Sequence, residues 1–163
     1  MVLLKSFSIL LGALLSTMFL IGCQQSTGAD TTTIAVDNPE SPYPREEAIE
    51  NGDVVDIFGE ITNLDKFEEF IENFEAGIED EIRITLYTVE GDPVFYNLNF
   101  DGDKINYTYD DSQDGYAGAD RGAQSTSCSE ITSENTDEGT MYSLKECSSS
   151  DVGSTFYFLI PKS

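Results

Sequence analysis

The sequence predicts an α+β fold, in which an antiparallel meander of about five or six strands carries one main amphipathic helix on one face. Three observations lead to this prediction. Apolar and polar residues alternate over three consecutive segments between positions 82 and 109. Apolar residues recur at three- and four-residue spacing between positions 64 and 76. The chain has 163 residues, so an apolar leader and a polar stretch leave room for a single exported domain over residues 44–163.

Residues 1–22 are expected to form a signal peptide. Lys5 precedes an apolar run that ends in Leu20-Ile21-Gly22-Cys23, and this tetrapeptide resembles the bacterial lipobox. In proteins with that motif the Cys thiol is joined to diacylglycerol and the leader is cut off in front of it. The resemblance implies a lipid on Cys23 and a location on the outer face of the cell membrane, where two acyl chains anchor a protein firmly. A permanent membrane span and a secreted protein with a free Cys23 are the alternatives.

Residues 23–43 are expected to be a flexible tether between the lipid and the domain. They are rich in Ser, Thr, Gly, Asp, Asn and Pro, with too few apolar residues to offset the entropy of ordering. Pro39, Pro42 and Pro44 favour an extended backbone toward the end of this segment.

The first elements of the domain are a short helix over residues 44–50, ended by Asn51-Gly52, and a short apolar strand or buried connection over residues 53–58. The main helix is expected over residues 64–76, with Asn63 or Thr62 as the N-cap and Gly77 as the C-terminal stop. Its phenylalanine stripe predicts packing against the sheet, and a ligand-lining face is the alternative.

The strands of the meander follow this helix. Asp101-Gly102 predicts a two-residue hairpin between two of them, in which both turn positions have positive φ. The six strands are expected over residues 82–87, 94–100, 105–109, 124–131, 141–146 and 155–160.

Cys128 and Cys147 are expected to form a disulfide, because a pair of cysteines in a small exported domain most simply pairs. Redox catalysis is the alternative, but such enzymes normally carry a Cys-x-x-Cys pair, which is absent here.

The charge of the chain argues against several classes of function. The net charge is -23, with 31 acidic and 8 basic residues, so phosphate backbones are repelled and nucleic acid is not an expected partner. Histidine is absent, which argues against zinc sites and Ser-His-Asp catalysis. No cofactor and no catalytic residue is assigned, although a hydrolase that uses two carboxylates remains an alternative.

The segment 110–122 resembles the first half of a calcium-binding loop. Asp110, Ser112 and Asp114 supply oxygens at alternate positions, and Gly115 follows where a sharp turn is needed. The twelfth position holds Arg121 instead of a bidentate Glu, so a mobile acidic loop is the favoured interpretation and a calcium-binding surface domain the alternative.

The chain resembles a group of small lipoproteins of bacilli and related Gram-positive bacteria, whose exported part is a domain of unknown function. That group implies the same location and the same disulfide, and it carries no activity that could be transferred to single residues. The expected role is therefore a non-catalytic binding module that contacts an envelope protein or a wall component. The residues that carry the resemblance are the lipobox, Asn51-Gly52-Asp53-Val54-Val55, Phe67, Phe70, Ile82-Arg83-Ile84-Thr85, Tyr87-Thr88, Glu90-Gly91-Asp92-Pro93, Tyr107-Thr108-Tyr109-Asp110, Cys128 and Cys147.

Overall fold

The structure is a computed structural model that describes residues 43–162. The predicted signal peptide, Cys23 and the tether up to residue 42 lie outside the described residues. None of the helices within residues 43–162 is both long and apolar enough to cross a membrane.

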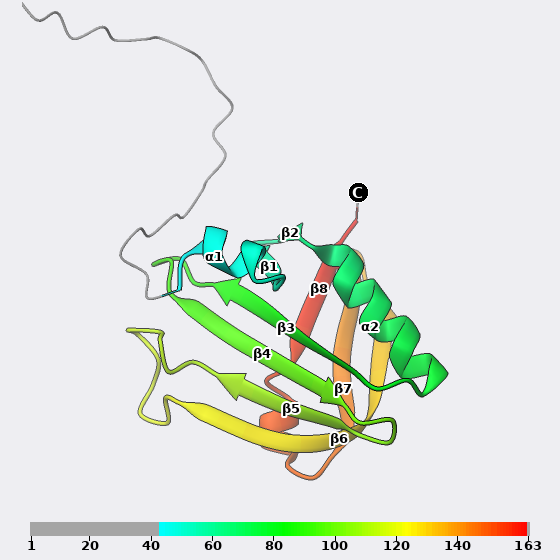
Figure 1. Ribbon diagram of the computed structural model, residues 1–163. Helices are drawn as coiled ribbons and strands as arrows, with labels where there is room; N and C mark the ends of the chain where they lie inside the picture. Colours follow the sequence, from blue (N-terminus) through cyan, green and yellow to red (C-terminus); the bar gives the residue numbers. More distant parts are fainter. Residues whose placement is uncertain (1–42, 163) are drawn as a thin grey trace, which may run out of the picture. The chain divides into compact units, whose positions relative to one another are not determined.

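Eight strands form one mixed sheet in the order β2-β1-β3-β4-β5-β6-β7-β8 (Figure 1). The strands β1 and β3 are parallel, and every other neighbouring pair is antiparallel. In chain order the elements are α1 (Arg45–Glu50), β1 (Val54–Ile57), β2 (Glu60–Thr62), α2 (Leu64–Ala76), β3 (Asp80–Tyr87), β4 (Pro93–Phe100), β5 (Ile105–Asp110), β6 (Ala123–Asn135), β7 (Gly139–Cys147), α3 (Ser150–Gly153) and β8 (Tyr157–Pro161).

The sheet curls until it is nearly closed into a barrel. Gly59, in the turn between β1 and β2, lies beside Pro161 at the end of β8, since a Cβ on Gly59 would be 3.1 Å from Cγ of Pro161. The helix α2, which follows β2, packs against β7 and β8 across this seam. Its Phe67 ring meets Tyr142 of β7 at 4.9 Å and Phe158 of β8 at 4.7 Å, both edge to face.

The predicted α+β class is therefore wrong: the domain is mostly β, with eight strands and three small helices among the described residues. The meander itself runs from β3 to β8, but α2 is a crossover that brings β1 into parallel pairing with β3. Local alternation of apolar residues carries no information about such a pairing. Twist accumulated over eight strands then curls the sheet. The predicted arrangement, an open sheet with a helix on one face, did not include this curvature.

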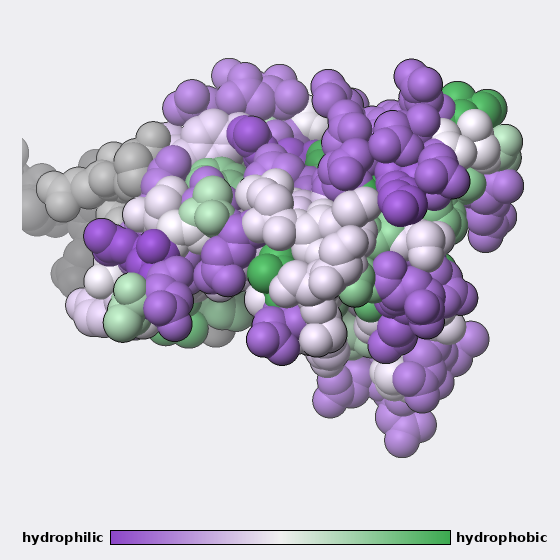
Figure 2. Space-filling view, turned by 90° about the horizontal axis from the view of Figure 1, so that it is seen from below, coloured by the Kyte–Doolittle hydropathy of each residue, from purple (hydrophilic) through white to green (hydrophobic). Residues whose placement is uncertain are grey.

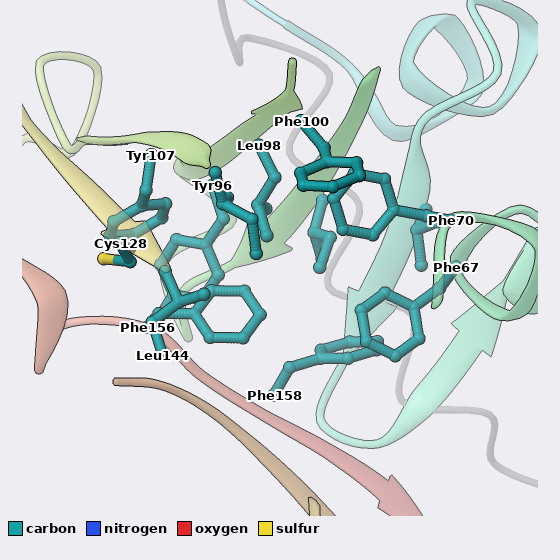
Figure 3. Close-up of a cluster of buried hydrophobic side chains, with 13 residues drawn as sticks. Phe67, Phe70, Tyr96, Leu98, Phe100, Tyr107, Cys128, Leu144, Phe156 and Phe158 are labelled. Carbon is teal, nitrogen blue, oxygen red and sulfur yellow. The ribbon is translucent and has the colours of Figure 1, made fainter. Parts of the chain in front are cut away.

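The interior of the curled sheet is filled by aromatic and aliphatic side chains (Figure 3). Phe67 and Phe70 of α2 are fully buried, as the three- and four-residue spacing predicted. Across the core, Tyr96, Tyr107 and Phe156 contact one another at centroid distances of 5.5 to 5.9 Å.

A second, smaller cluster lies on the other face of β1 and β3, where α1 covers the sheet. It contains Ala48, Val55, Ile57 and Tyr87, with Tyr43 and Ile49 packed against it. This cover explains why β3 is buried on both faces in its second half, at Ile84 and at Thr85.

The helix α2 begins and ends where the sequence predicts. Asn63 is its N-cap residue and Gly77, with φ +68°, is the C-cap. The Asn63 side chain does not cap the helix, however. Its amide donates to the carbonyl oxygens of Ile49 at 3.3 Å and Asp53 at 2.8 Å, and so fixes the segment between α1 and β1.

The two-residue hairpin occurs at a different place from the one predicted. Phe58 and Gly59 join β1 to β2 with φ of 53° and 89°, although Phe is an unusual residue for such a turn. Between β4 and β5 the loop has four residues, and of these only Gly102 has positive φ. Asp101 holds that loop by accepting hydrogen bonds from the amides of Asp103 and Lys104, which lower the pKa of its carboxyl.

The disulfide between Cys128 and Cys147 is confirmed. The two residues are register partners on β6 and β7, and Cys128 is fully buried. Gly153 of α3 packs so closely on the Cys147 sulfur that a Cβ at this position would clash with it. The disulfide thus joins two long strands and provides the surface on which α3 sits.

Candidate functional site

A polar hollow of about 460 Å³ lies where β1 and β3 begin and α2 passes alongside them. Four segments contribute to it: the α1–β1 connection, α2, the start of β3 and the middle of β4. Its lining residues are Asn51, Gly52, Asp53, Lys66, Glu69, Asp80, Glu81, Ile82, Arg83 and Asn97.

Asp53 is the most deeply buried charged residue of this lining, with 6% of its surface exposed. Its Oδ2 accepts hydrogen bonds from the Thr85 hydroxyl at 2.6 Å and the Tyr43 hydroxyl at 3.0 Å. The Tyr43 hydroxyl in turn accepts from the Asn51 amide at 3.1 Å. Burial raises the pKa of Tyr43, and the Asp53 carboxylate adds to the rise.

The second carboxylate oxygen of Asp53 remains available. No residue within 43–162 donates a hydrogen bond to Oδ1, whereas Oδ2 accepts two. Because Asp53 lines the hollow, this oxygen is the acceptor that a bound group with N–H or O–H donors would use.

Arg83 is held in place without an ion pair. Its Nε donates to Oδ1 of Asn97 at 2.8 Å, and its guanidinium lies over the Phe95 ring at 5.4 Å from the centroid. Within residues 43–162 the one ion pair joins Arg45 to Glu60, at 3.9 Å. The guanidinium of Arg83 is therefore oriented by an amide, an aromatic ring and the Tyr43 hydroxyl, and its charge has no carboxylate partner in the described part of the chain.

Lys66 is placed on the hollow by a glycine. Its Cε and Nζ would each lie 3.4 Å from a Cβ built on Gly52, whose φ is +86°. Gly52 thus allows both the left-handed backbone after α1 and the close approach of the lysine. Glu69 follows Lys66 at i+3 on α2 and also lines the hollow.

The other two carboxylates of the lining are already hydrogen-bonded within the domain. Asp80 accepts from the Asn73 side chain at 2.9 Å and from the Glu81 amide at 2.8 Å. Glu81 accepts from the Asn99 side chain at 3.4 Å. The groups left for a ligand are two cations, Lys66 and Arg83, and two acceptors, Asp53 and Glu69. Such an arrangement suits recognition of a small polar molecule by charge.

Of the predicted calcium-loop residues Asp110, Ser112 and Asp114, the two aspartates accept hydrogen bonds from the loop's own backbone. Asp110 accepts from the amide of Ser112 at 2.9 Å, and Asp114 accepts from the amide of Tyr116 at 2.8 Å. Asp111, which the calcium pattern did not include, accepts from the amide of Gly122 at 2.6 Å and closes the base of the loop. Across residues 43–162, no three acidic or cysteine side chains come together in a way that could hold a metal ion.

The sequence did not single out Asp53, Lys66 or Arg83 as site residues. Asp53 and Thr85 lie 32 positions apart and meet only because β1 pairs with β3. One signal was present, since Lys66 and Arg83 are two of only eight basic residues in the chain. Both lie where amphipathic patterning alone predicts an ordinary solvated side chain.

Comparison with known proteins places the chain in a family. Neither a curated protein nor a solved structure matches it. The model of a family described as a domain of unknown function, DUF4362, matches residues 51–143. The match covers more than half of the chain and includes every lining residue of the hollow. The chain therefore belongs to the DUF4362 family.

Proposed function

We propose that this protein is a lipid-anchored surface protein whose domain binds a small polar group of the cell envelope in the hollow beside α2. The observation that carries the binding role is that Lys66 and Arg83 line the same hollow, and that neither forms an ion pair with a described residue. Arg83 is fixed by Asn97 and Phe95, and it lines the hollow.

The anchor is proposed from the sequence of the leader. Leu20-Ile21-Gly22-Cys23 closes an apolar run of signal-peptide length, and a diacylglycerol on Cys23 would hold the protein on the outer face of the membrane. The polar tether would then let the domain reach envelope proteins or wall components. A disulfide in the domain is consistent with an oxidising location.

Binding without catalysis is the role that the hollow supports best. Its side chains are ammonium, guanidinium, carboxylate and amide groups, all of which recognise charge, and the chain has no histidine to act as a base near neutral pH. A hydrolase that uses two carboxylates would need a pair free to move protons. Asp80 and Glu81 are instead occupied by hydrogen bonds from Asn73, Glu81 and Asn99. The hydroxyls of Thr85 and Tyr43 hold Oδ2 of Asp53, so Glu69 is the one carboxylate of the lining that accepts no hydrogen bond from a described residue.

The anchor is tested by fractionation of cells that produce Cys23→Ala or the matched Ser26→Ala variant. We expect the Ser26→Ala protein to sediment with membranes. The Cys23→Ala protein should lose the lipid and the associated mass, since no thiol remains to be acylated. Equal acyl mass by mass spectrometry on both proteins would refute the anchor.

The binding role is tested by affinity capture from native membranes and walls. We expect the wild-type protein to retain a partner that the double variant Lys66→Gln/Arg83→Gln loses. The control variant Lys104→Gln/Lys145→Gln removes the same amount of charge outside the hollow and should keep the partner. Turnover of wall polymers or peptides by the purified protein would contradict a non-catalytic role.

A further inference from the structure

We infer that the hollow recognises a zwitterion, a ligand with a free carboxylate and a free ammonium group of the kind found in amino acids and short peptides. This inference rests on the proposed binding function and names the chemistry of the ligand. It follows from the signs of the charges that meet at the hollow, from which of them are already satisfied, and from the size of the space.

A ligand of one sign would leave part of the charged lining unpaired. Four carboxylates line the hollow, from Asp53, Glu69, Asp80 and Glu81, so a simple anion would meet net repulsion. A simple cation would be attracted by the carboxylates but would leave Lys66 and Arg83 without an opposite charge. A molecule that carries both charges satisfies both sets of side chains.

The carboxylate of the ligand is assigned to Arg83. A guanidinium presents parallel N–H donors that match the two oxygens of a carboxylate. The hydrogen bond from Nε to Asn97 and the Phe95 ring restrict the orientation of this side chain, so little entropy is lost when it binds. Lys66, held against Gly52, adds a second positive charge at the same hollow.

The ammonium group of the ligand is assigned to Asp53 and Glu69. Oδ1 of Asp53 is a carboxylate oxygen on a residue with 6% exposure, and no described residue donates to it. A charged donor at so sheltered an acceptor gains more than it would in open water. Asn51 and Asn97 offer further amide groups for the remainder of the ligand.

The size of the space fits this class of ligand. A volume of about 460 Å³ lies at the lower end of the range of about 300–1,000 Å³ for small-molecule sites. An amino acid or a dipeptide fits within it and brings both charges into the hollow.

The test uses the full-length protein in detergent and four probes in isothermal titration calorimetry. The probes are alanyl-alanine as its L,L and D,D isomers, N-acetyl-alanyl-alanine, and alanyl-alanine amide. We expect at least one free dipeptide to bind. The acetylated form, which lacks the ammonium, and the amide, which lacks the carboxylate, should each bind at least about tenfold more weakly, as loss of a charge-assisted hydrogen bond predicts.

Variants assign each charge of the ligand to its side chain. Arg83→Gln should weaken the free dipeptide about tenfold and leave the amide unchanged, because the amide has no carboxylate to lose. Asp53→Asn and the exposed Glu69→Gln should weaken the free dipeptide and leave the acetylated form unchanged. Lys145→Gln, outside the hollow, is the matched control and should bind every probe like the wild type.

The inference is wrong if neither dipeptide binds at millimolar concentration, if the amide binds as tightly as the free dipeptide, or if Arg83→Gln weakens all probes alike. Retention of a membrane or wall partner by the wild type, with no binding of any dipeptide, would reject the zwitterion and leave the proposed function intact. If the wild type retained no partner and bound no dipeptide, both the zwitterion inference and the proposed function would be rejected.

Discussion

At the scale of single residues, the hydroxyl of Thr85 is one of the two groups that hold the Asp53 carboxylate in place, and the Tyr43 hydroxyl is the other. Thr85 is fully buried, and its hydroxyl donates to Oδ2 at 2.6 Å. We expect Thr85→Val to lower the free energy of unfolding by about 1.5–3 kcal/mol, since a buried carboxylate loses a donor. Thr108→Val, which removes an exposed hydroxyl bonded to Ser125 on another strand, should cost less. Urea denaturation of both variants measures the difference, and equal losses would show that Asp53 does not depend on Thr85.

Tyrosines in the core make stability sensitive to alkaline pH. Burial raises the pKa of Tyr96 to about 12 and raises that of Tyr107 further. Both hydroxyls are neutral in the folded protein, so their contribution is complete below the ordinary pKa of 10 and is lost as the pH rises above it. We expect the denaturation midpoint to fall between pH 10 and pH 12.

A matched pair of variants separates this effect from the general repulsion among acidic groups. Tyr96→Phe should make the alkaline loss of stability smaller, whereas Tyr116→Phe, at a position with 79% exposure, should leave the pH profile like that of the wild type. Identical profiles for all three proteins would mean that the ionisation of Tyr96 does not limit stability.

At the scale of elements, the disulfide fixes the register of the two longest paired strands. Cys128 and Cys147 are 19 positions apart, and closing a loop of that size stabilises a domain by about 3 kcal/mol in the chain-entropy model. We expect Cys128→Ala/Cys147→Ala to unfold at correspondingly lower urea concentration. Dithiothreitol should destabilise the wild type by a similar amount and have no effect on the variant, and a reductant effect on the variant would contradict this origin.

Sequence patterns predicted the elements well where the information is local. The stripe of Phe67 and Phe70 and the stop at Gly77 located α2, and alternation located the strands from β3 to β8. The strand β2 was missed because it has three residues and follows a turn at Phe58, a residue that seldom adopts positive φ.

The candidate site was less accessible to sequence reasoning, because it depends on contacts between distant segments. From the sequence alone, Asp53 is interpreted as an acidic residue of a loop, and Arg83 as an outward-facing residue of an alternating strand. Their positions at the hollow follow from the parallel pairing of β1 with β3 and from α2, which brings Lys66 to Gly52. In segment 110–122 the sequence pattern suggested a site that the structure explains otherwise. A pattern typical of calcium loops also arises when aspartates accept hydrogen bonds from the backbone of their own turns.

At the scale of the whole domain, α2 closes the core that the curled sheet leaves open. Phe67 is fully buried and touches β7 and β8, so its removal leaves a void between the two ends of the sheet. We expect Phe67→Ala to cost about 3–5 kcal/mol. Phe58→Ala, at a side chain with 59% exposure, should cost far less, and thermal unfolding followed by circular dichroism compares them. If the two substitutions lowered the free energy of unfolding by similar amounts, the contacts of Phe67 would not be those that close the core.

The surface of the domain is dominated by charge. The face seen in Figure 2 is mostly hydrophilic, with hydrophobic residues in small separate patches. This surface agrees with 31 acids in the chain and favours a polar ligand at the hollow over a broad apolar partner surface on that face.

Near-closure of the sheet also protects the domain from aggregation. An open sheet of this size would present two long rows of unpaired amide and carbonyl groups, on which a second molecule could add its own strand. Here one edge is β2, with three residues, and the other is β8, with five residues ending at Pro161. Pro161 lies against Gly59 across the seam and has no amide hydrogen to donate. Molecules of this protein would therefore stay separate from one another, even at a high local concentration.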